Sequence, residues 1–239
     1  MNALVAQIRA ETRMSLRRGE SLLVTLGIPL LLLLFFGTVD LLPTGDRDQL
    51  EFLVPSILAL AVMSTAMVNL AISTGFERQY GVLKRLGATP LGRPRLMVAK
   101  TAVVVLVETI QVVAVTFLGL VLGWRPDGSV GLALVAVGVG TVAFAGLGLL
   151  MAGALRAEAT LAVANGLYVV LLLVGGIAVP LESLPAAIGA LAALTPSAAL
   201  AQVLVSILGG DAVPIGSWLV LGFWALAAPA AAIRLFRWE

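Results

Sequence analysis

Long apolar stretches separated by short polar segments recur along the whole of this 239-residue chain. A helix of about 20 apolar residues crosses the hydrocarbon core of a bilayer, and backbone polar groups inside lipid must be bonded within the crossing segment. We therefore predict an all-α, polytopic membrane protein in which residues 1–239 form a single transmembrane domain. Its six transmembrane helices are expected at residues 21–42, 52–73, 101–122, 130–155, 159–179 and 215–233.

The composition agrees with a membrane protein and excludes several kinds of chemistry. Hydrophobic residues make up 60% of the chain and charged residues 12%, whereas an ordinary soluble domain has about half and about a quarter. The chain has no cysteine and no histidine. It therefore has no disulfide, no thiol nucleophile, no Cys/His metal site and no Ser-His-Asp triad. We predict no catalytic residue and no bound metal.

Lysine and arginine are distributed unevenly between the two sides of the predicted bundle. The six-span topology places thirteen basic residues on the side of the termini and two, Arg47 and Arg125, on the other. Because basic loops stay inside the cell, both termini are predicted to be cytoplasmic. The net charge is only +2 and the basic residues flank spans, so no nucleic-acid partner is expected. Arginine far exceeds lysine, as in GC-rich bacteria, so the expected location is a bacterial plasma membrane.

Residues 1–20 predict an amphipathic helix that precedes the first span. Leu4 and Ile8 fall on one helical face, while Arg9, Arg13 and Arg17 repeat every four residues on another. A helix with one apolar and one basic face lies in the plane of the membrane interface. We therefore expect this segment to be an interfacial helix that contacts the lipid bilayer.

Residues 181–208 are apolar enough for a further span but carry helix-breaking signals. Pro185 and Pro196 interrupt the stretch, and a seventh full crossing would place the C-terminal arginines outside the cell. We therefore predict a broken, re-entrant helix pair on the external side. Its broken backbone is tolerable there only if it is buried in protein.

The loop between the second and third spans, residues 76–96, carries an ordered set of helix and turn signals. Apolar side chains recur at helical spacing, Gly87 supplies a C-cap, and Thr89 with Pro90 supplies the start of another helix. The pattern predicts a short cytoplasmic helix, a tight turn and a restart. The loop is either a basic segment that only fixes topology or a docking element for a cytoplasmic protein, and the order of its turn signals favours docking.

These segments resemble parts of a known family. Residues 76–94 resemble the first cytoplasmic loop of ABC-2 type permeases, which carry an acidic residue, then glycine, a leucine-rich helix and Thr-Pro. Residues 180–197, with Pro-Leu-Glu-Ser-Leu-Pro and Leu-Thr-Pro-Ser, are similar to the broken external helices of that family. The amphipathic N-terminus and six spans fit as well, so the resemblance covers nearly the whole chain.

The resemblance implies the membrane subunit of an ABC exporter. Such a subunit dimerises, with a second copy or a paralogue, and binds two cytoplasmic ATPase subunits that hold ATP and Mg. The N-terminal segment, with Arg9, Arg13 and Arg17, would be the connecting helix. The residues placed by position in the coupling helix against the ATPase are Glu77, Tyr80, Gly81, Leu83, Arg85 and Leu86.

The chain itself lacks a phosphate-binding loop for ATP. The motif Gly-x-x-x-x-Gly-Lys-Ser/Thr is absent, because neither lysine, Lys84 or Lys100, follows the required glycine. We therefore expect no cofactor on this chain and no ATP hydrolysis by it alone. The energy for transport comes from a partner ATPase or from an ion gradient.

Four polar residues inside predicted spans are candidates for a substrate route. Glu108 is the deepest acid, and Gln111 lies one turn further on the same helix. An ionisable group exposed to lipid costs at least about 2.5 kcal/mol, so Glu108 is expected to face the protein interior. It either lines the route or binds a cation, or it is a protonated acid bonded between helices. Asn69 and Asn165 are weaker cases that favour helix–helix hydrogen bonds.

Small residues recur four apart in the fourth predicted span, at Ala136 and Gly140 and at Gly148 and Ala152. This spacing permits the close approach of a neighbouring helix.

The function predicted from these features is the permease subunit of an ATP-driven exporter that works by alternating access. The apolar interior and small external loops favour a hydrophobic or amphipathic substrate, such as a drug, an antibiotic or a lipid-like molecule. One alternative is a proton-coupled secondary transporter or a channel that uses Glu108. Another is a membrane scaffold whose cytoplasmic loop recruits a protein without transport.

Overall fold

The computed structural model describes residues 3–17, 19–39, 48–87, 92–178 and 180–236, and all regular structure in these ranges is helical. The predicted all-α class is therefore confirmed. The elements are α1 (Ala3–Arg17), α2 (Gly19–Thr38), α3 (Gln49–Val62), a π-helix η1 (Met63–Asn69), α4 (Leu70–Gln79), α5 (Val82–Gly87), α6 (Gly92–Val121), α7 (Val130–Ala154), α8 (Ala157–Val174), a 3-10 turn η2 (Leu181–Ser183), α9 (Ala186–Ala192), α10 (Pro196–Leu208) and α11 (Ile215–Leu235).

The helices of the described chain form a membrane-spanning bundle. Five helical runs are long and apolar enough to cross a bilayer, and they coincide with the second to sixth predicted spans: Gln49–Gln79, Pro94–Val121, Val130–Ala154, Ala157–Val174 and Ile215–Leu235. The first predicted span falls on α2, whose described apolar part, Leu23–Thr38, is shorter. Residues 40–42 of that predicted span lie outside the described residues.

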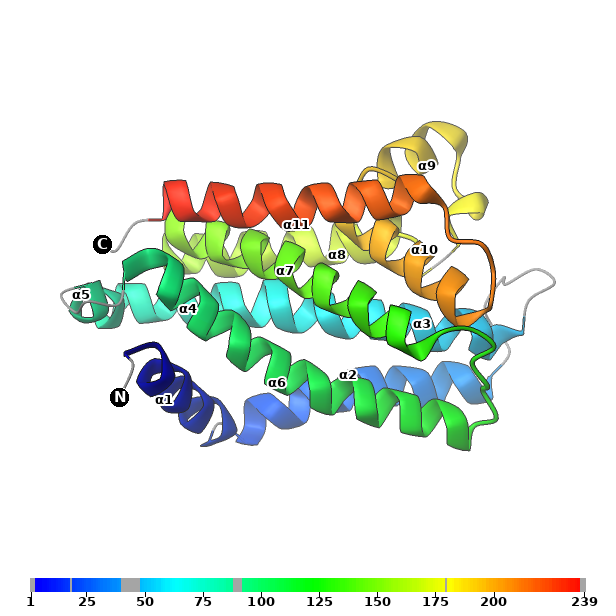
Figure 1. Ribbon diagram of the computed structural model, residues 1–239, viewed down its shortest axis with the longest axis horizontal. Coiled ribbons are helices and arrows are strands. Elements are labelled where there is room, and N and C mark those ends of the chain that lie inside the picture. The colour runs from blue at the N-terminus through cyan, green and yellow to red at the C-terminus, as the bar shows by residue number, and fades with distance from the viewer. Residues whose placement is uncertain (1–2, 18, 40–47, 88–91, 179, 237–239) are drawn as a thin grey trace.

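The two ends of the bundle carry different elements. Figure 1 shows α1, α5 and the C-terminal end of α11 at one end, and α9 and α10 at the other. This arrangement agrees with an even number of crossings between α1 and the end of α11. We call the end that carries α1 and α5 the α5 end, which is the side predicted to be cytoplasmic.

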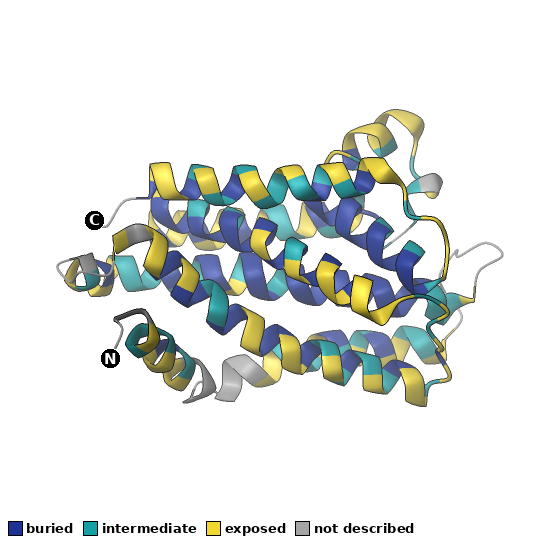
Figure 2. Ribbon diagram, in the orientation of Figure 1, coloured by how far each residue is buried: buried dark blue, intermediate teal, exposed yellow. Residues whose placement is uncertain are grey.

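The run from α3 through η1 to α4 is the most buried of the candidate spans (Figure 2). Its middle is a π-helix, in which hydrogen bonds skip one residue more than in an α-helix and the turn widens. Gly148 of α7 packs directly on this turn, because a Cβ there would lie 2.7 Å from the carbonyl oxygen of Met67. The small residues predicted to permit close packing therefore bring α7 against the backbone of the central span.

The predicted broken helix pair is confirmed as α9 and α10, which are bent by 90°. Pro196 occupies the first turn of α10, and the hydroxyl oxygen of Thr195 accepts a hydrogen bond from the Ala198 backbone N–H. α9 is mostly exposed, whereas α10 is mostly buried and packs against α3, α7 and α11 (Figure 2). That burial satisfies the condition under which a broken helix is tolerated at membrane depth.

Two predicted boundaries need correction at the loop between the second and third spans. The helix of the second span continues to Gln79 and α6 already begins at Gly92, so the loop is shorter than residues 76–96. The reason is that both helices extend beyond the apolar stretch, where charged side chains meet water and one another. The predicted helix start at Thr89 and Pro90 lies outside the described residues.

Candidate functional site

The short helix α5 lies between the second and third spans, at the end of the bundle that also carries α1. Gly81 precedes it with a φ of +70°, a left-handed conformation that glycine adopts without strain, and this residue turns the chain from α4 into α5. Tyr80, just before the turn, is 73% exposed, and its ring stacks on Phe76 with centroids 6.2 Å apart. Arg85 is also exposed.

The leucines of α5 point inward. Leu83 is fully buried in the hydrophobic core, and Leu86 is half-buried against it. Tyr80 and the two leucines therefore do not share one outward face, because Tyr80 is exposed and the leucines pack inward. A helix of six residues has too few turns for an apolar face on both sides, and its leucines anchor it to its own bundle.

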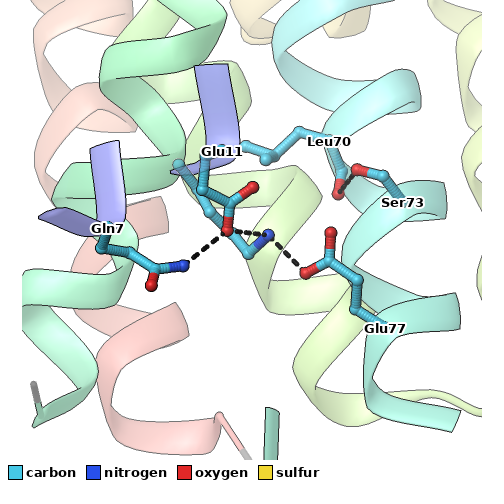
Figure 3. Close-up of polar contacts among 6 residues, drawn as sticks. Gln7, Glu11, Leu70, Ser73 and Glu77 are labelled. Carbon is cyan, nitrogen blue, oxygen red and sulfur yellow. Dashed lines mark hydrogen bonds and ion pairs between the residues drawn. The ribbon is translucent and has the colours of Figure 1, made fainter. Parts of the chain in front are cut away.

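A buried ion triplet lies next to α5 and joins three helices. Lys100 of α6 is only 2% exposed, and its Nζ lies 2.6 Å from Glu77 Oε2 of α4 and 3.1 Å from Glu11 Oε1 of α1. Gln7 Nε2 donates a further hydrogen bond of 2.9 Å to Glu11 Oε1. Figure 3 shows Glu11 and Glu77 approaching from different helices toward one ammonium nitrogen.

The ion triplet attaches the N-terminal helix to the bundle. Burying charges is costly, so removing one partner leaves an uncompensated charge and destabilises by about 3–5 kcal/mol. Arg9 and Arg13, in contrast, are exposed, and the side chain of Arg17 lies outside the described residues. The contact between α1 and α6 thus includes a buried acid in an otherwise basic helix.

Two further residues at the end of α4 bind the other side of the bundle. Arg78 donates to the backbone carbonyls of Gly153, at 2.7 Å, and of Leu155, at the C-terminus of α7. Gln79 Nε2 donates to Glu158 Oε1 of α8 at 2.7 Å. Arg78 thereby satisfies carbonyls that a helix C-terminus leaves without internal partners.

Glu77, Arg78 and Gln79 therefore contact α6, α7 and α8 respectively, directly before α5 begins. These contacts join the segment before α5 to three helices of the bundle. Of these three residues, only Glu77 was predicted to act in coupling, and its ion-triplet partners Lys100 and Glu11 were not predicted as site residues. The available signal was a pair of acids, Glu11 and Glu77, in otherwise basic segments.

Two cavities lie beside the central span. The charged cavity has a volume of about 400 Å³ and is lined by the ion triplet at one end and by residues of α2, η1, α4 and α6. The second cavity, of about 210 Å³, lies between α2, η1 and α8. Both include Thr25 and Asn69, and Asn69 Nδ2 donates to Thr25 Oγ1 at 2.9 Å.

Of the four polar residues predicted for a substrate route, two line the cavities and two are buried between helices. Asn69 lines both cavities and Asn165 lines the second, where it also donates to Leu161 O of its own helix at 2.8 Å. Glu108 and Gln111 are buried between helices and belong to the lining of neither cavity. Their part in a substrate route stays a prediction.

Gln111 and Glu108 differ in how many of their polar side-chain atoms have hydrogen-bond partners. Gln111 accepts from Thr65 Oγ1 at 2.8 Å and donates to the backbone oxygen of Thr25 at 2.9 Å, so it links α6 to η1 and α2. Glu108 Oε2 accepts from Thr141 Oγ1 of α7 at 2.5 Å. Its Oε1 is buried and has no hydrogen-bond partner among the described residues.

Comparison with protein families gives one match over most of the chain. A family model described as ABC-2 type transporter matches residues 2–208. The matched range includes α5, the ion triplet and both cavities. A search of curated proteins found no match.

Proposed function

The chain belongs to the ABC-2 type transporter family and is thus the membrane permease subunit of an ABC transporter, which we propose to be an exporter. The family implies a separate ABC ATPase as its partner. In this proposal the ATPase binds ATP and Mg, and this chain provides the route through the membrane.

The observation that carries the proposal is the way α5 is attached. Leu83 fastens α5 to the core, and Glu77 and Arg78 fasten the preceding helix to α6 and α7. When the ATPase subunits close on ATP, they move α5, and these contacts carry the movement into the spans. Switching of access between the two sides of the membrane follows from that movement.

The six predicted coupling residues divide into three roles in this proposal. Tyr80 and Arg85 are exposed and contact the ATPase. Gly81 makes the turn that presents them. Leu83 and Leu86 anchor α5, and Glu77 acts through the ion triplet.

The apolar surfaces of the spans support a dimer in the bilayer. Phe117 of α6 and Phe223 of α11 are 67% and 62% exposed, and such surfaces face lipid or a second membrane subunit. The second subunit is either another copy or a paralogue. The proposed cargo is hydrophobic or amphipathic, the termini are cytoplasmic, and the membrane is a bacterial plasma membrane.

The family favours an ATPase-driven mechanism over the proton-coupled alternative. Glu108 remains the residue on which that alternative depends, because its Oε1 is buried without a described partner. The scaffold alternative also predicts a bound cytoplasmic protein, but it predicts no transport.

Co-purification tests the proposal. The chain is expressed with a candidate ABC ATPase from the same genome, and both the recovered ATPase and its ATP hydrolysis are measured. We expect a stable complex that hydrolyses ATP and a purified chain that does not. An ATPase variant without its phosphate-loop lysine controls for contaminating activity. Hydrolysis by the chain alone, or a folded chain that retains no ABC ATPase, would contradict the proposal.

A further inference from the structure

The charged cavity joins a polar end to an apolar wall. Its polar end holds Glu11, Glu77 and Lys100. Its apolar wall includes Val103, Val104 and Val107, which follow Lys100 on one face of α6. Seven residues of helix separate Lys100 from Val107, so this face extends about 10 Å along α6. A site of this shape suits a molecule with a charged head and an apolar chain.

The charge at the polar end is negative, because two carboxylates share one ammonium. Glu11 Oε1 and Glu77 Oε2 contact Lys100 Nζ, and the second oxygen of each carboxylate has no hydrogen-bond partner among the described residues. Figure 3 shows these second oxygens of Glu11 and Glu77 directed away from the shared nitrogen. One additional N–H-bearing cation would neutralise the cavity and bond both oxygens.

The size of the charged cavity is suitable for a small ligand. Its volume of about 400 Å³ lies within the range of about 300–1,000 Å³ that small-molecule sites occupy. Asn69 and Thr25 line both cavities, and the hydrogen bond between them lies where the two cavities adjoin. A longer chain would extend past this bond toward Pro29 and Tyr168.

We propose that the charged cavity binds an amphiphile with a primary ammonium headgroup. The headgroup bonds to the second carboxylate oxygens of Glu11 and Glu77, and the apolar chain lies along the valines of α6. Describing this molecule as cargo rests on the proposed exporter function, whereas the binding site itself does not. The ammonium comes from a single-chain amine or from a membrane lipid with an ethanolamine headgroup.

The absence of cysteine from the chain provides a direct test. Ser73 lines the charged cavity one helical turn before Glu77, and among the described residues its hydroxyl donates to Leu70 O of its own helix, at 3.3 Å. Ser73→Cys therefore introduces one thiol into the cavity. The full-length variant is purified in neutral maltoside micelles, and its alkylation by N-ethylmaleimide is measured with dodecylamine or dodecanol added.

Dodecylamine should slow alkylation of the Ser73→Cys thiol about tenfold more than dodecanol, since a hydrogen bond to a charged group is commonly worth that factor. Ala159→Cys is the control, because Ala159 is exposed on α8 and lines neither cavity. Its alkylation should not depend on the amine. Phosphatidylethanolamine added in place of dodecylamine tests the lipid source, and protection by either compound supports the primary ammonium.

The carboxylates are tested by adding Glu11→Gln and Glu77→Gln to Ser73→Cys. The preference for dodecylamine over dodecanol should then disappear. If these variants do not fold, the comparison of dodecylamine with dodecanol on Ser73→Cys alone still tests whether the site prefers the ammonium. Equal protection by dodecanol, free alkylation in the presence of both amines, or a preference that survives both Gln variants would overturn the proposal. No ATPase takes part, so this failure is distinct from a failure of the exporter proposal.

Discussion

The α5 end and the middle of the bundle are held together in different ways. At the α5 end, the described contacts between helices include the ion triplet and the hydrogen bonds of Arg78 and Gln79. In the middle, α7 approaches its neighbours through glycines. Gly148 lies against the backbone of η1, and a Cβ on Gly146 would lie 2.5 Å from the backbone nitrogen of Pro229 in α11.

The difference follows from the surroundings of each region. Charged side chains cost little free energy near water, whereas inside lipid they cost much more. Inside lipid, close packing of small residues holds the helices together. Close-packed backbones have no second arrangement at similar energy, but side-chain ion pairs can exchange partners. In the proposed mechanism, the α5 end receives the movement of the ATPase and the middle of the bundle moves as a unit.

The largest expected effect is that of Lys100→Met at the α5 end. The change leaves Glu11 and Glu77 buried without a cation, at a cost of about 3–5 kcal/mol. Thermal unfolding, followed by loss of the monodisperse peak in detergent, should occur at a clearly lower temperature. Lys84→Met is the matched control, because Lys84 is the other lysine of the chain and is exposed.

A triple variant separates the loss of one charge from the loss of the whole ion triplet. Replacing Glu11 and Glu77 by leucine together with Lys100→Met removes all three charges, and apolar replacements of a whole buried ion cluster are often neutral or stabilising. The triple variant should therefore recover most of the stability that Lys100→Met loses. If Lys100→Met unfolds at the same temperature as Lys84→Met, the ion triplet does not hold the α5 end.

In the middle of the bundle, Gly148→Ala should destabilise by about 2–3 kcal/mol, near the upper end of typical overpacking costs. Its methyl group would meet the carbonyl oxygens of Met67 and Ala66, which are backbone atoms that cannot rotate away. Gly138→Ala on the same helix is the control, because a Cβ there meets no atom within 4 Å. Equal unfolding temperatures for the two variants would show that α7 does not pack closely on η1.

A smaller effect is expected from Leu83→Ala, which loosens α5 without disturbing the spans. Truncating this buried leucine should cost about 2 kcal/mol, at the low end of the usual range because α5 lies at the edge of the bundle. Trypsin should then cut faster after Lys84 and Arg85. Val82→Ala, at a position already 38% exposed, should leave the cleavage rate unchanged. Similar rates for both variants would mean that Leu83 does not anchor α5.

The smallest effect is expected from Glu108→Gln. It retains the hydrogen bond from Thr141 and changes stability by less than about 1 kcal/mol, since hydrogen bonds between membrane helices average about 0.6 kcal/mol. In an ATP-driven exporter, transport should persist and should not follow the proton gradient at constant ATP. Loss of all uphill transport in this variant would favour the proton-coupled alternative.

The spans and the broken pair could be predicted because their signals are local. Apolar length identifies a crossing helix, and Pro185 and Pro196 mark the two breaks directly. The π-helix at Met63–Asn69 could not, because no residue type specifies a shift of one residue in the hydrogen-bond pattern.

The candidate site was only partly predictable. The position of α5 followed from its turn signals, but its inward face depends on how the helix docks on the core. The ion triplet joins Glu11, Glu77 and Lys100, which are far apart in the sequence, and no spacing rule connects them. Asn69 and Asn165 were recognised as polar residues within spans, but the cavities beside them arise from the packing of several helices.

In the proposed function, the α5 end binds the ATPase through the exposed residues beside and on α5. The most direct test is photo-crosslinking of the complex, with p-benzoylphenylalanine in place of Tyr80. Phe117 and Phe223, which are exposed aromatic residues of the spans, provide matched control positions. We expect an adduct with the ATPase from the Tyr80 position and none from the two phenylalanine positions. An ATPase adduct from either phenylalanine position, with none from Tyr80, would contradict it.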